Sequence, residues 1–352
     1  MDAADAFGIV VIDESPGVGL QEQNLALPAT LAHHLVVEAE HVRRDKNRAS
    51  VIMWSVANEP ESSTPPAAPY FQAVIAQVRA LDATRPVLFV CDQDFAGDLA
   101  MPYADVIAIN RYYAWYEENG ELDVITRELT ADLLGWRAKY PTKPIMLTEY
   151  GADTIPGFHD GTGSPFSWTE DYQTLFYRPY FGVFDAFRTN ESFGFIGEHT
   201  WCFADFMTVE GTGRAVGNHK GLLTRERAPK AAALQLRARF NAIAAAAPQC
   251  PLALRELAES GCAAPLGAAP VRAALPPAPA RGAPAPAFEL RQAQPPPRAQ
   301  ALRREDGAAA AAPRDGRRAL LSHLGARLAG LQASGALAAE EAGALRDALE
   351  GA

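Results

Sequence analysis

The stretch Val51-Ile52-Met53-Trp54-Ser55-Val56-Ala57-Asn58-Glu59-Pro60 decides the fold. It begins with a nearly continuous apolar run, which is typical of a strand that is covered on both faces in a parallel sheet. The run ends in an amide, a carboxyl group and a proline that stops the strand. A second apolar run is followed by Thr148-Glu149-Tyr150-Gly151. Two carboxylates, Glu59 and Glu149, therefore follow two predicted buried strands.

Similar runs alternate with amphipathic stretches through the first 245 residues, and this repeat favours an α/β fold of the (β/α)8 TIM-barrel type. We expect strands at residues 7–14, 50–59, 86–92, 105–113, 144–151 and 195–205, and helices near 29–48, 67–82, 121–140, 169–190 and 228–245. The connection from 93 to 104 has room for at most a turn of helix. Barrel enzymes carry their chemistry at the carboxyl ends of the strands, where Glu59 and Glu149 are predicted to lie.

The composition changes after this region, so three segments are predicted. Residues 1–246 form the barrel domain. Residues 247–316 are rich in Ala, Pro and Arg, and runs of proline exclude a sustained helix or a central strand, which predicts a disordered linker. Residues 317–352 recover a helical period with a leucine-rich face, which fits a helical hairpin, a docking segment, or a helix that is marginal alone and has no partner.

Charge and composition exclude several classes of partner. The chain has 42 acidic and 32 basic side chains and a net charge of −10, which argues against a nucleic-acid partner. The four cysteines are far apart and show no metal-ligand spacing. Neither a signal peptide nor a membrane span is visible. We therefore expect no nucleic acid and no membrane among the partners, and the compartment stays unknown.

A pair of carboxylates that face one pocket is the minimum equipment for cleaving a glycosidic bond. Glu59, if its environment keeps it protonated, can deliver a proton to the leaving oxygen, and Asn58 can bind a neighbouring sugar hydroxyl. Glu149 is expected to point into the mouth of the barrel. Proton transfer and covalent catalysis are then both supplied by carboxyl groups, so we predict no metal and no organic cofactor.

Several stretches together resemble the catalytic barrel of the β-glucuronidases of glycoside hydrolase family 2. The similar stretches are Phe7 to Glu14, Arg43 to Asn47, Met53 to Pro60, Asn110 to Tyr116, Thr148 to Ala152, Trp201 to Met207 and Gly217 to Lys230. The resemblance implies that Glu59 is the acid/base and that Glu149 is the nucleophile of a retaining double displacement. It also implies that their carboxyl groups are about 5–5.5 Å apart.

The segment Gly217-Asn218-His219-Lys220-Gly221 bears on the substrate. Asn218 and Lys220 can present an amide and an ammonium to a sugar carboxylate, a charge-assisted contact that a neutral sugar would leave unpaired. The resemblance implies that this pair selects glucuronic acid and that Arg214 lies near the same carboxylate. A substrate of the β-D-glucuronide class follows.

Three aromatic residues complete the predicted site. Tyr112 follows the strand at 105–113, and the resemblance implies that its hydroxyl contacts Glu149 and tunes that carboxylate. Tyr116 fits sugar binding and packing equally well. Trp201 fits either a platform under an apolar sugar face or a packing residue at the barrel rim.

Other polar side chains in the barrel segment are assigned structural roles. Asp13, Glu14 and Glu198 are expected to be hydrogen-bonded barrel carboxylates and not a third catalytic group. His33, His34 and His41 fall on a helical pattern and are expected at the surface and not as metal ligands.

The strand count is two short of a complete barrel. If Glu59 ends strand four and Glu149 ends strand seven, the chain carries strands three to eight and lacks the family's N-terminal domains. It is then either a truncated product or a fragment that works as an oligomer or with a second chain that completes the barrel. Two alternatives to a β-glucuronidase stay open: a neutral-sugar glycosidase such as a β-galactosidase, and a non-catalytic truncated barrel that acts as a scaffold. Family members are lysosomal or cytoplasmic.

Overall fold

A computed structural model describes residues 1–162, 165–209, 214 and 217–246 of the chain. Met1–Ala238 belong to one compact unit, and a second unit begins at Arg239, of which only Arg239–Ala246 is described. The linker predicted at 247–316 and the helical segment predicted at 317–352 lie outside the described residues.

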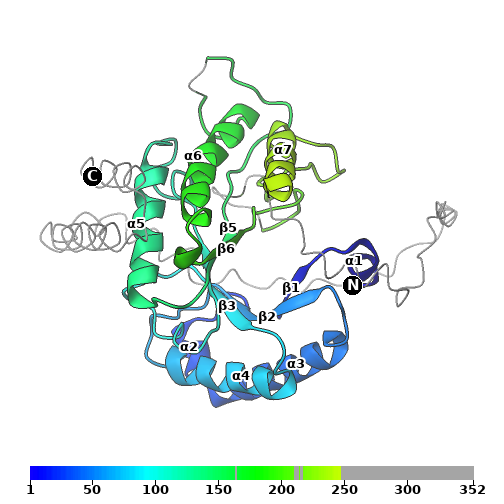
Figure 1. The fold of residues 1–352 in the computed structure, drawn as a ribbon, viewed down its shortest axis with the longest axis vertical. Coiled ribbons are helices and arrows are strands. Elements are labelled where there is room, and N and C mark those ends of the chain that lie inside the picture. Colours follow the sequence, from blue (N-terminus) through cyan, green and yellow to red (C-terminus); the bar gives the residue numbers. More distant parts are fainter. Residues whose placement is uncertain (163–164, 210–213, 215–216, 247–352) are drawn as a thin grey trace, which may run out of the picture. The chain divides into compact units, whose positions relative to one another are not determined.

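The first unit is built on a parallel sheet of six strands, which confirms the predicted β/α repeat (Figure 1). The strands are β1 (Val11–Glu14), β2 (Val51–Asn58), β3 (Val87–Cys91), β4 (Ile107–Asn110), β5 (Ile145–Glu149) and β6 (Phe195–Glu198). Each strand pairs in parallel with the next one along the chain. Within the described part of the chain β1 pairs only with β2 and β6 only with β5, so these six strands form an open part of a barrel.

Helices follow most strands and pack against the outer face of the sheet, as Figure 1 shows for α3 to α6. The helices are α1 (Asp2–Phe7), α2 (Glu22–Leu25), α3 (Pro28–Asp45), α4 (Ala67–Leu81), α5 (Val124–Lys139), α6 (Glu170–Arg188) and α7 (Ala231–Ala246), with a short 3₁₀ turn, η1, at Glu191–Phe193. The connection between β3 and β4, all of which the structure describes, contains no helix, as expected for its short length. Among the described residues, no helix combines the length and the apolar character needed to cross a membrane.

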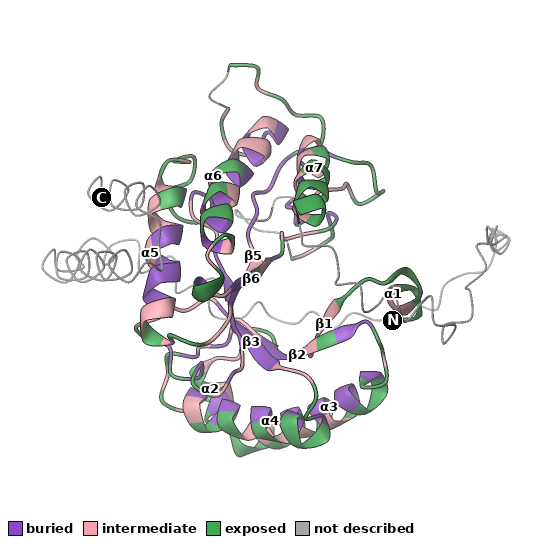
Figure 2. Ribbon diagram, in the orientation of Figure 1, coloured by how far each residue is buried: buried purple, intermediate pink, exposed green. Residues whose placement is uncertain are grey.

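Two apolar layers lie on the two faces of the sheet, and β3 shows how the sequence creates them. Val87, Phe89 and Cys91 belong to the core between the strands and the helices. Leu88 and Val90, which alternate with them, join a smaller inner cluster with residues of β4 and β5. All five residues of β3 are buried, which is why the strand reads as continuously apolar (Figure 2).

The first and last strands are shorter than predicted. Residues 2–7 form helix α1, which ends at Gly8 in the left-handed conformation with φ of 69°, so β1 begins only at Val11. The strand expected to extend to 205 ends at Glu198, and the chain continues as an irregular loop. An apolar run in the sequence indicates that a strand is present. It does not show how many of its residues are hydrogen-bonded to the neighbouring strand.

The prediction of surface histidines on α3 was wrong for two of the three. His33 is exposed, but His34 and His41 are buried because they flank Glu38, which is completely buried. His34 Nε2 lies 3.1 Å from one oxygen of Glu38, and His41 Nδ1 lies 3.4 Å from the other. Asp13 of β1 lies 3.1 Å from His41 Nε2. The charges stabilise one another in a buried network that joins α3 to β1.

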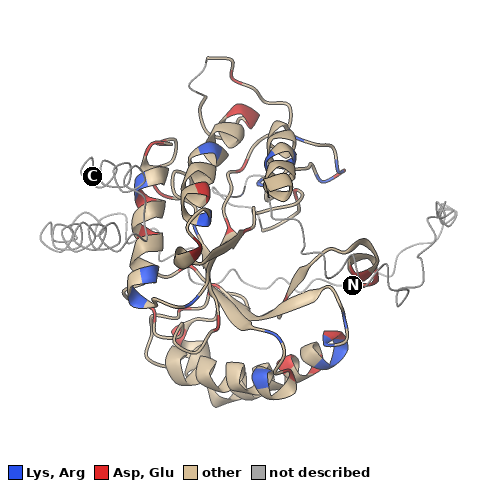
Figure 3. Cartoon of the chain, viewed as in Figure 1, with Lys and Arg blue, Asp and Glu red and all other residues tan. Residues whose placement is uncertain are grey.

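Charged side chains of both signs occur along α3, α5 and α6 (Figure 3).

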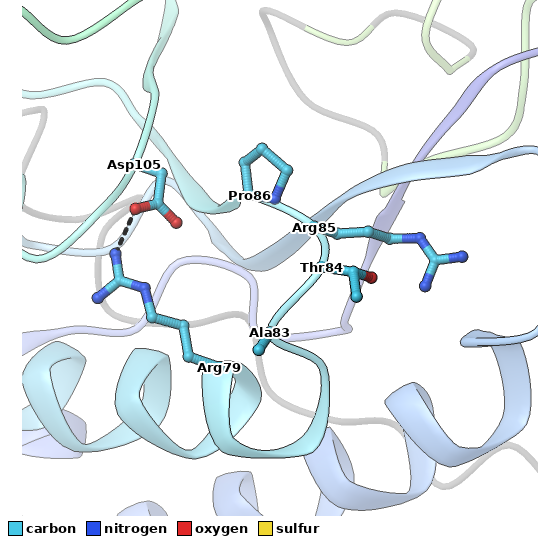
Figure 4. A pocket seen from close by; sticks show the side chains of 6 residues that line it. All are labelled: Arg79, Ala83, Thr84, Arg85, Pro86 and Asp105. Carbon is cyan, nitrogen blue, oxygen red and sulfur yellow. Dashed lines mark hydrogen bonds and ion pairs between the residues drawn. The ribbon is translucent and has the colours of Figure 1, made fainter.

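A hollow of about 470 Å³ lies beside the N-terminal end of β3, between Arg79, Arg85 and Asp105 (Figure 4). Arg79 already pairs with Asp105 at 2.6 Å, and Arg85 pairs with Asp82 at the same distance. This hollow is at the end of the sheet opposite to Glu59 and Glu149, so it is not where barrel chemistry is expected.

The buried network predicts a pH-dependent stability. Burial lowers the pKa of His41, but Glu38 and Asp13 outweigh it, and the net pKa is raised. The stabilisation is therefore complete below the unfolded pKa of His and is lost as pH rises through the raised value. His41→Gln should destabilise the protein by about 1–3 kcal/mol at pH 5.5 and by less at pH 8.5. Urea denaturation at both pH values measures this, with His33→Gln as the exposed control, and an equal loss at both would contradict it.

Candidate active site

The carboxyl ends of β2, β4 and β5 bring the predicted catalytic side chains to one edge of the sheet. Asn58 is the last residue of β2, and Glu149 is the last residue of β5. Glu59 follows with a positive φ of 49°, a conformation that costs a non-glycine residue about 1–3 kcal/mol. Its backbone N–H donates to the carbonyl of Val90, which fixes the residue at the end of the sheet.

Asn110, the last residue of β4, connects the two carboxylates. Its Nδ2 donates to Glu59 Oε1 at 2.9 Å and lies 3.3 Å from Asn58 Oδ1. Its Oδ1 accepts from the hydroxyl of Thr148 at 2.8 Å. Because Asn110 is opposite Glu149 in the strand register, one buried amide holds the predicted acid/base and lies beside the predicted nucleophile.

Glu149 has an unusual protonation equilibrium. Burial raises its pKa to about 8, the charges of Glu59 and Glu14 act in the same direction, and hydrogen bonds from Tyr112 and Asn110 oppose them. The Tyr112 hydroxyl donates to Glu149 Oε2 at 2.5 Å. Burial and Glu149 raise the pKa of Tyr112 well above 10, so the phenol stays a donor. A substantial fraction of Glu149 is therefore protonated near neutral pH.

A cationic corner lies on the other side of Tyr112. We use this name for Lys220, Arg214, Tyr116 and Asp153. Lys220 is completely buried, and its Nζ lies 4.6 Å from the ring centre of Tyr116, 4.9 Å from that of Trp115 and 5.6 Å from that of Tyr112. Aromatic faces stabilise an ammonium at such distances. Burial nevertheless lowers the pKa of Lys220 to about 8.

The hydroxyl of Tyr116 lies between the two cations of this corner. It contacts Lys220 Nζ at 3.1 Å and accepts from Arg214 Nη2 at 2.5 Å. The side chain is 53% exposed and its ring meets that of Tyr112 edge-on at 5.0 Å, so it forms part of the rim. Of the two roles open for Tyr116, these contacts favour binding of a polar ligand over packing.

Asn218 and Trp201 lie less directly in the site. Asn218 is buried, and its Oδ1 accepts from the backbone N–H of Lys220 at 3.0 Å, so this oxygen stabilises its own loop. Trp201 follows β6 and packs edge-on against Phe206 at 5.9 Å. That contact fits a packing residue at the rim. It is also compatible with a role of Trp201 as a platform for a sugar.

Two residues of this arrangement were missed by reasoning from the sequence. Asn110 closes a strand as Asn58 does, and that shared position could have revealed it. Asp153 lies in a loop four residues after Glu149, and no periodicity marks it. The structural assignments of Glu14 and Glu198 agree with their contacts, because Glu14 accepts from Ser55 at 2.7 Å and Glu198 pairs with Arg188 at 2.7 Å.

One group of side chains in the described ranges could offer three donor atoms to a metal ion. Atoms of Asp13, His41 and Asp45 lie within 4.8 Å of one another. Arg44 already pairs with Asp45 at 2.5 Å and His41 with Glu38, so the charges of the group have protein partners. This group lies behind β1, between the strand and α3, and does not take part in the arrangement around Glu149.

Comparisons with known proteins agree with this geometry. The β-glucuronidase of Canis lupus familiaris is 49% identical over 240 residues, which are 68% of this chain and 36% of that protein. The solved β-D-glucuronidase of Dictyoglomus thermophilum has a TM-score of 0.64 and 44% identity over 68% of this chain and 42% of its own. The Bifidobacterium dentium β-glucuronidase, solved in complex with coumarin-3-O-glucuronide, has a TM-score of 0.63 and 38% identity over 68% of this chain and 38% of its own.

The matched part of the chain is the part that carries the sheet. The chain spans little more than a third of the length of the Canis lupus familiaris relative. The model of the glycosyl hydrolases family 2 TIM barrel domain matches residues 1–245. This match includes every strand of the sheet and every side chain of the site, and the chain therefore belongs to glycosyl hydrolase family 2.

Proposed function

We propose that this chain carries the catalytic site of a retaining β-glucuronidase. The observation that supports this best is that a buried cation and the carboxylate of Glu149 both contact one aromatic side chain. Nζ of Lys220 lies 5.6 Å from the ring of Tyr112, whose hydroxyl donates to Glu149. One aromatic ring thus separates the two charges, a spacing suited to a sugar with its anomeric carbon at Glu149 and its carboxylate at Lys220.

The proposed reaction is a double displacement. Glu149 attacks the anomeric carbon, the bond to the leaving oxygen breaks, and Glu59 gives its proton to that oxygen. Water then attacks the glycosyl ester, its proton passes to Glu59, and Glu149 leaves as a carboxylate. Asn58 binds the 2-hydroxyl, and Tyr112 holds the nucleophile. No step needs a metal or an organic cofactor, since each proton and each bond is assigned to a carboxyl group.

Lys220, Arg214 and Asn218 are proposed to bind the sugar carboxylate, and Tyr116 to orient it. A carboxylate that enters this corner meets an ammonium and a guanidinium, which form stronger hydrogen bonds than neutral donors. The Bifidobacterium dentium relative supports the substrate class, because it was solved in complex with a glucuronide. For other partners we keep the predictions made from the sequence: no nucleic acid, no membrane, and an oligomer or a second chain that completes the barrel.

The direct test of the proposed function is turnover of 4-nitrophenyl β-D-glucuronide by the full chain and by Glu149→Gln. Hydrolysis by the wild type and none by the variant is expected. The variant should be at least as stable as the wild type at pH 8, because a carboxyl whose pKa is raised by folding destabilises the fold as pH rises above its unfolded value. A folded wild type without turnover on any glycoside would favour the scaffold alternative.

The substrate class is tested by Lys220→Ala. The variant should lose about 100-fold in kcat/KM on the glucuronide, since a charge-assisted contact contributes about 3 kcal/mol. Turnover of the matching β-D-glucoside should change little. Lys230→Ala is the control, because this buried lysine pairs with Asp205 at 2.8 Å and any loss there should affect both substrates equally. Indifference of glucuronide turnover to Lys220→Ala would instead indicate a neutral-sugar glycosidase.

The role of Tyr112 is tested by the pH profile of Tyr112→Phe. The phenol donates to ionised Glu149 and thereby lowers its pKa, so its removal should shift the acidic limb of kcat/KM by about 1–2 pH units toward higher pH. Tyr177→Phe removes a buried hydroxyl that has no hydrogen-bond partner among the described residues and should leave the limb in place. An unshifted limb in Tyr112→Phe would contradict the assignment.

A further inference from the structure

Asp153 is completely buried and contacts both cations of the cationic corner. Its Oδ2 accepts from Nζ of Lys220 and lies 3.4 Å from Nη1 of Arg214. Its Oδ1 accepts from the backbone N–H of His219 at 2.7 Å. One carboxylate oxygen is therefore shared by the two cations, while the other holds the loop that carries Lys220.

The charges of this corner sum to one positive charge. Lys220 and Arg214 contribute two and Asp153 removes one. Among the described residues, the phenols of Tyr112 and Tyr116 and the thiol of Cys202 also face Lys220. Burial raises the pKa of all three, that of Cys202 to about 11, so they are neutral. A single substrate carboxylate would neutralise the corner, whereas a neutral sugar would leave its net positive charge uncompensated.

Asp153 also favours the charged form of Lys220. Burial lowers the pKa of Lys220 to about 8, Asp153 opposes this shift, and Arg214 adds to it. If Asp153 were uncharged, burial and Arg214 would act unopposed. The ammonium would then lose its proton at a lower pH and would bind an anion less tightly at neutral pH and above.

The backbone fixes the position of Asp153 relative to the strands. The backbone N–H of Thr154 donates to the backbone carbonyl of His219 at 3.1 Å. The backbone N–H of the same histidine donates to the carboxylate of Asp153. The segment after β5 and the loop after β6 are thus joined by two parallel contacts. Since Glu149 ends β5, these contacts link the loop of the cationic corner to the segment that directly follows the predicted nucleophile.

Building on the proposed function, we propose that Asp153 is a positioning residue that holds Lys220 and Arg214 as a pair with one net positive charge and thereby sets the selectivity for a single substrate carboxylate. It touches neither the sugar nor the reacting atoms. Its effect is on affinity for the anionic substrate and not on the chemical step.

The first test needs no turnover and therefore stands apart from the proposed function. The chain has five lysines, so 13C-lysine labelling of the full chain gives few NMR signals, and Lys220→Arg identifies that of Lys220. Asp153→Asn should lower the titration midpoint of Lys220 by about one unit or more. An unchanged midpoint would overturn the proposal, even if the chain proves inactive.

The second test uses kinetics on the glucuronide and the glucoside. In Asp153→Asn the KM for the glucuronide should rise about tenfold at pH 8 and much less at pH 6, where Lys220 is protonated with or without Asp153. Values of kcat and turnover of the glucoside should change little. Asp153→Glu keeps the charge and should restore most of the pH 8 affinity. Equal losses on both substrates at both pH values would show a merely structural role and overturn the proposal.

Asp205→Asn is the matched control. Asp205 is also buried and also holds this loop, because it accepts from the backbone N–H of Gly221 at 2.9 Å and pairs with Lys230. Its substitution should not lower the midpoint of Lys220 or change the pH dependence of KM. A shift as large as that of Asp153→Asn would contradict a specific role for Asp153.

A double variant covers the case in which Asp153→Asn does not fold. An unpaired buried ammonium is strongly destabilising, so removing it together with its partner should restore the fold. Asp153→Asn/Lys220→Met is therefore expected to fold, as circular dichroism can show. If the double variant also fails to fold, Asp153 serves the backbone and not Lys220, and the proposal fails.

Discussion

The parallel register of β2 to β5 is the constraint on which the candidate site depends. Parallel strands end at the same edge of a sheet, and here the backbone N–H of Glu59 donates to Val90 while that of Arg111 donates to Glu149. These backbone hydrogen bonds hold the ends of neighbouring strands together, and the side chains at these ends therefore lie close to one another. Asn110 uses that proximity, because its amide reaches Glu59 from the strand beside Glu149. The arrangement of the proposed catalytic pair is thus a consequence of strand pairing.

Burial then shifts the two kinds of charge in opposite directions. It raises the pKa of Glu149 to about 8 and lowers the pKa of Lys220 to about 8, because in both cases the charged form loses its water. Hydrogen bonds from Tyr112 and the charge of Asp153 counter these shifts. The pKa of each group is therefore shifted toward neutral pH, where a neighbouring charge has a large effect on its protonation. A bound carboxylate would favour the protonated form of Lys220.

The parts of this structure that follow a regular hydrophobic pattern could be predicted from the sequence. The parts that depend on irregular backbone could not. The apolar runs predict the strands, and the polar residues that end these runs predict the positions of Glu59 and Glu149. The left-handed Gly8 and the helix before it interrupt an apolar run that reads as strand. Burial of His34 and His41 depends on Glu38 finding partners on both sides, which no helical pattern shows.

The residues proposed for the chemical step and those proposed for substrate selectivity are held by different parts of the fold. Glu59, Asn110 and Glu149 lie at strand ends, where the sheet fixes them. Lys220 and Asp153 lie on loops after β6 and β5, which are joined by hydrogen bonds through His219 and not by sheet pairing. A change in these loops can alter the charge of the cationic corner without moving the carboxylate pair. Substrate class can therefore change in such a barrel while the catalytic step stays the same.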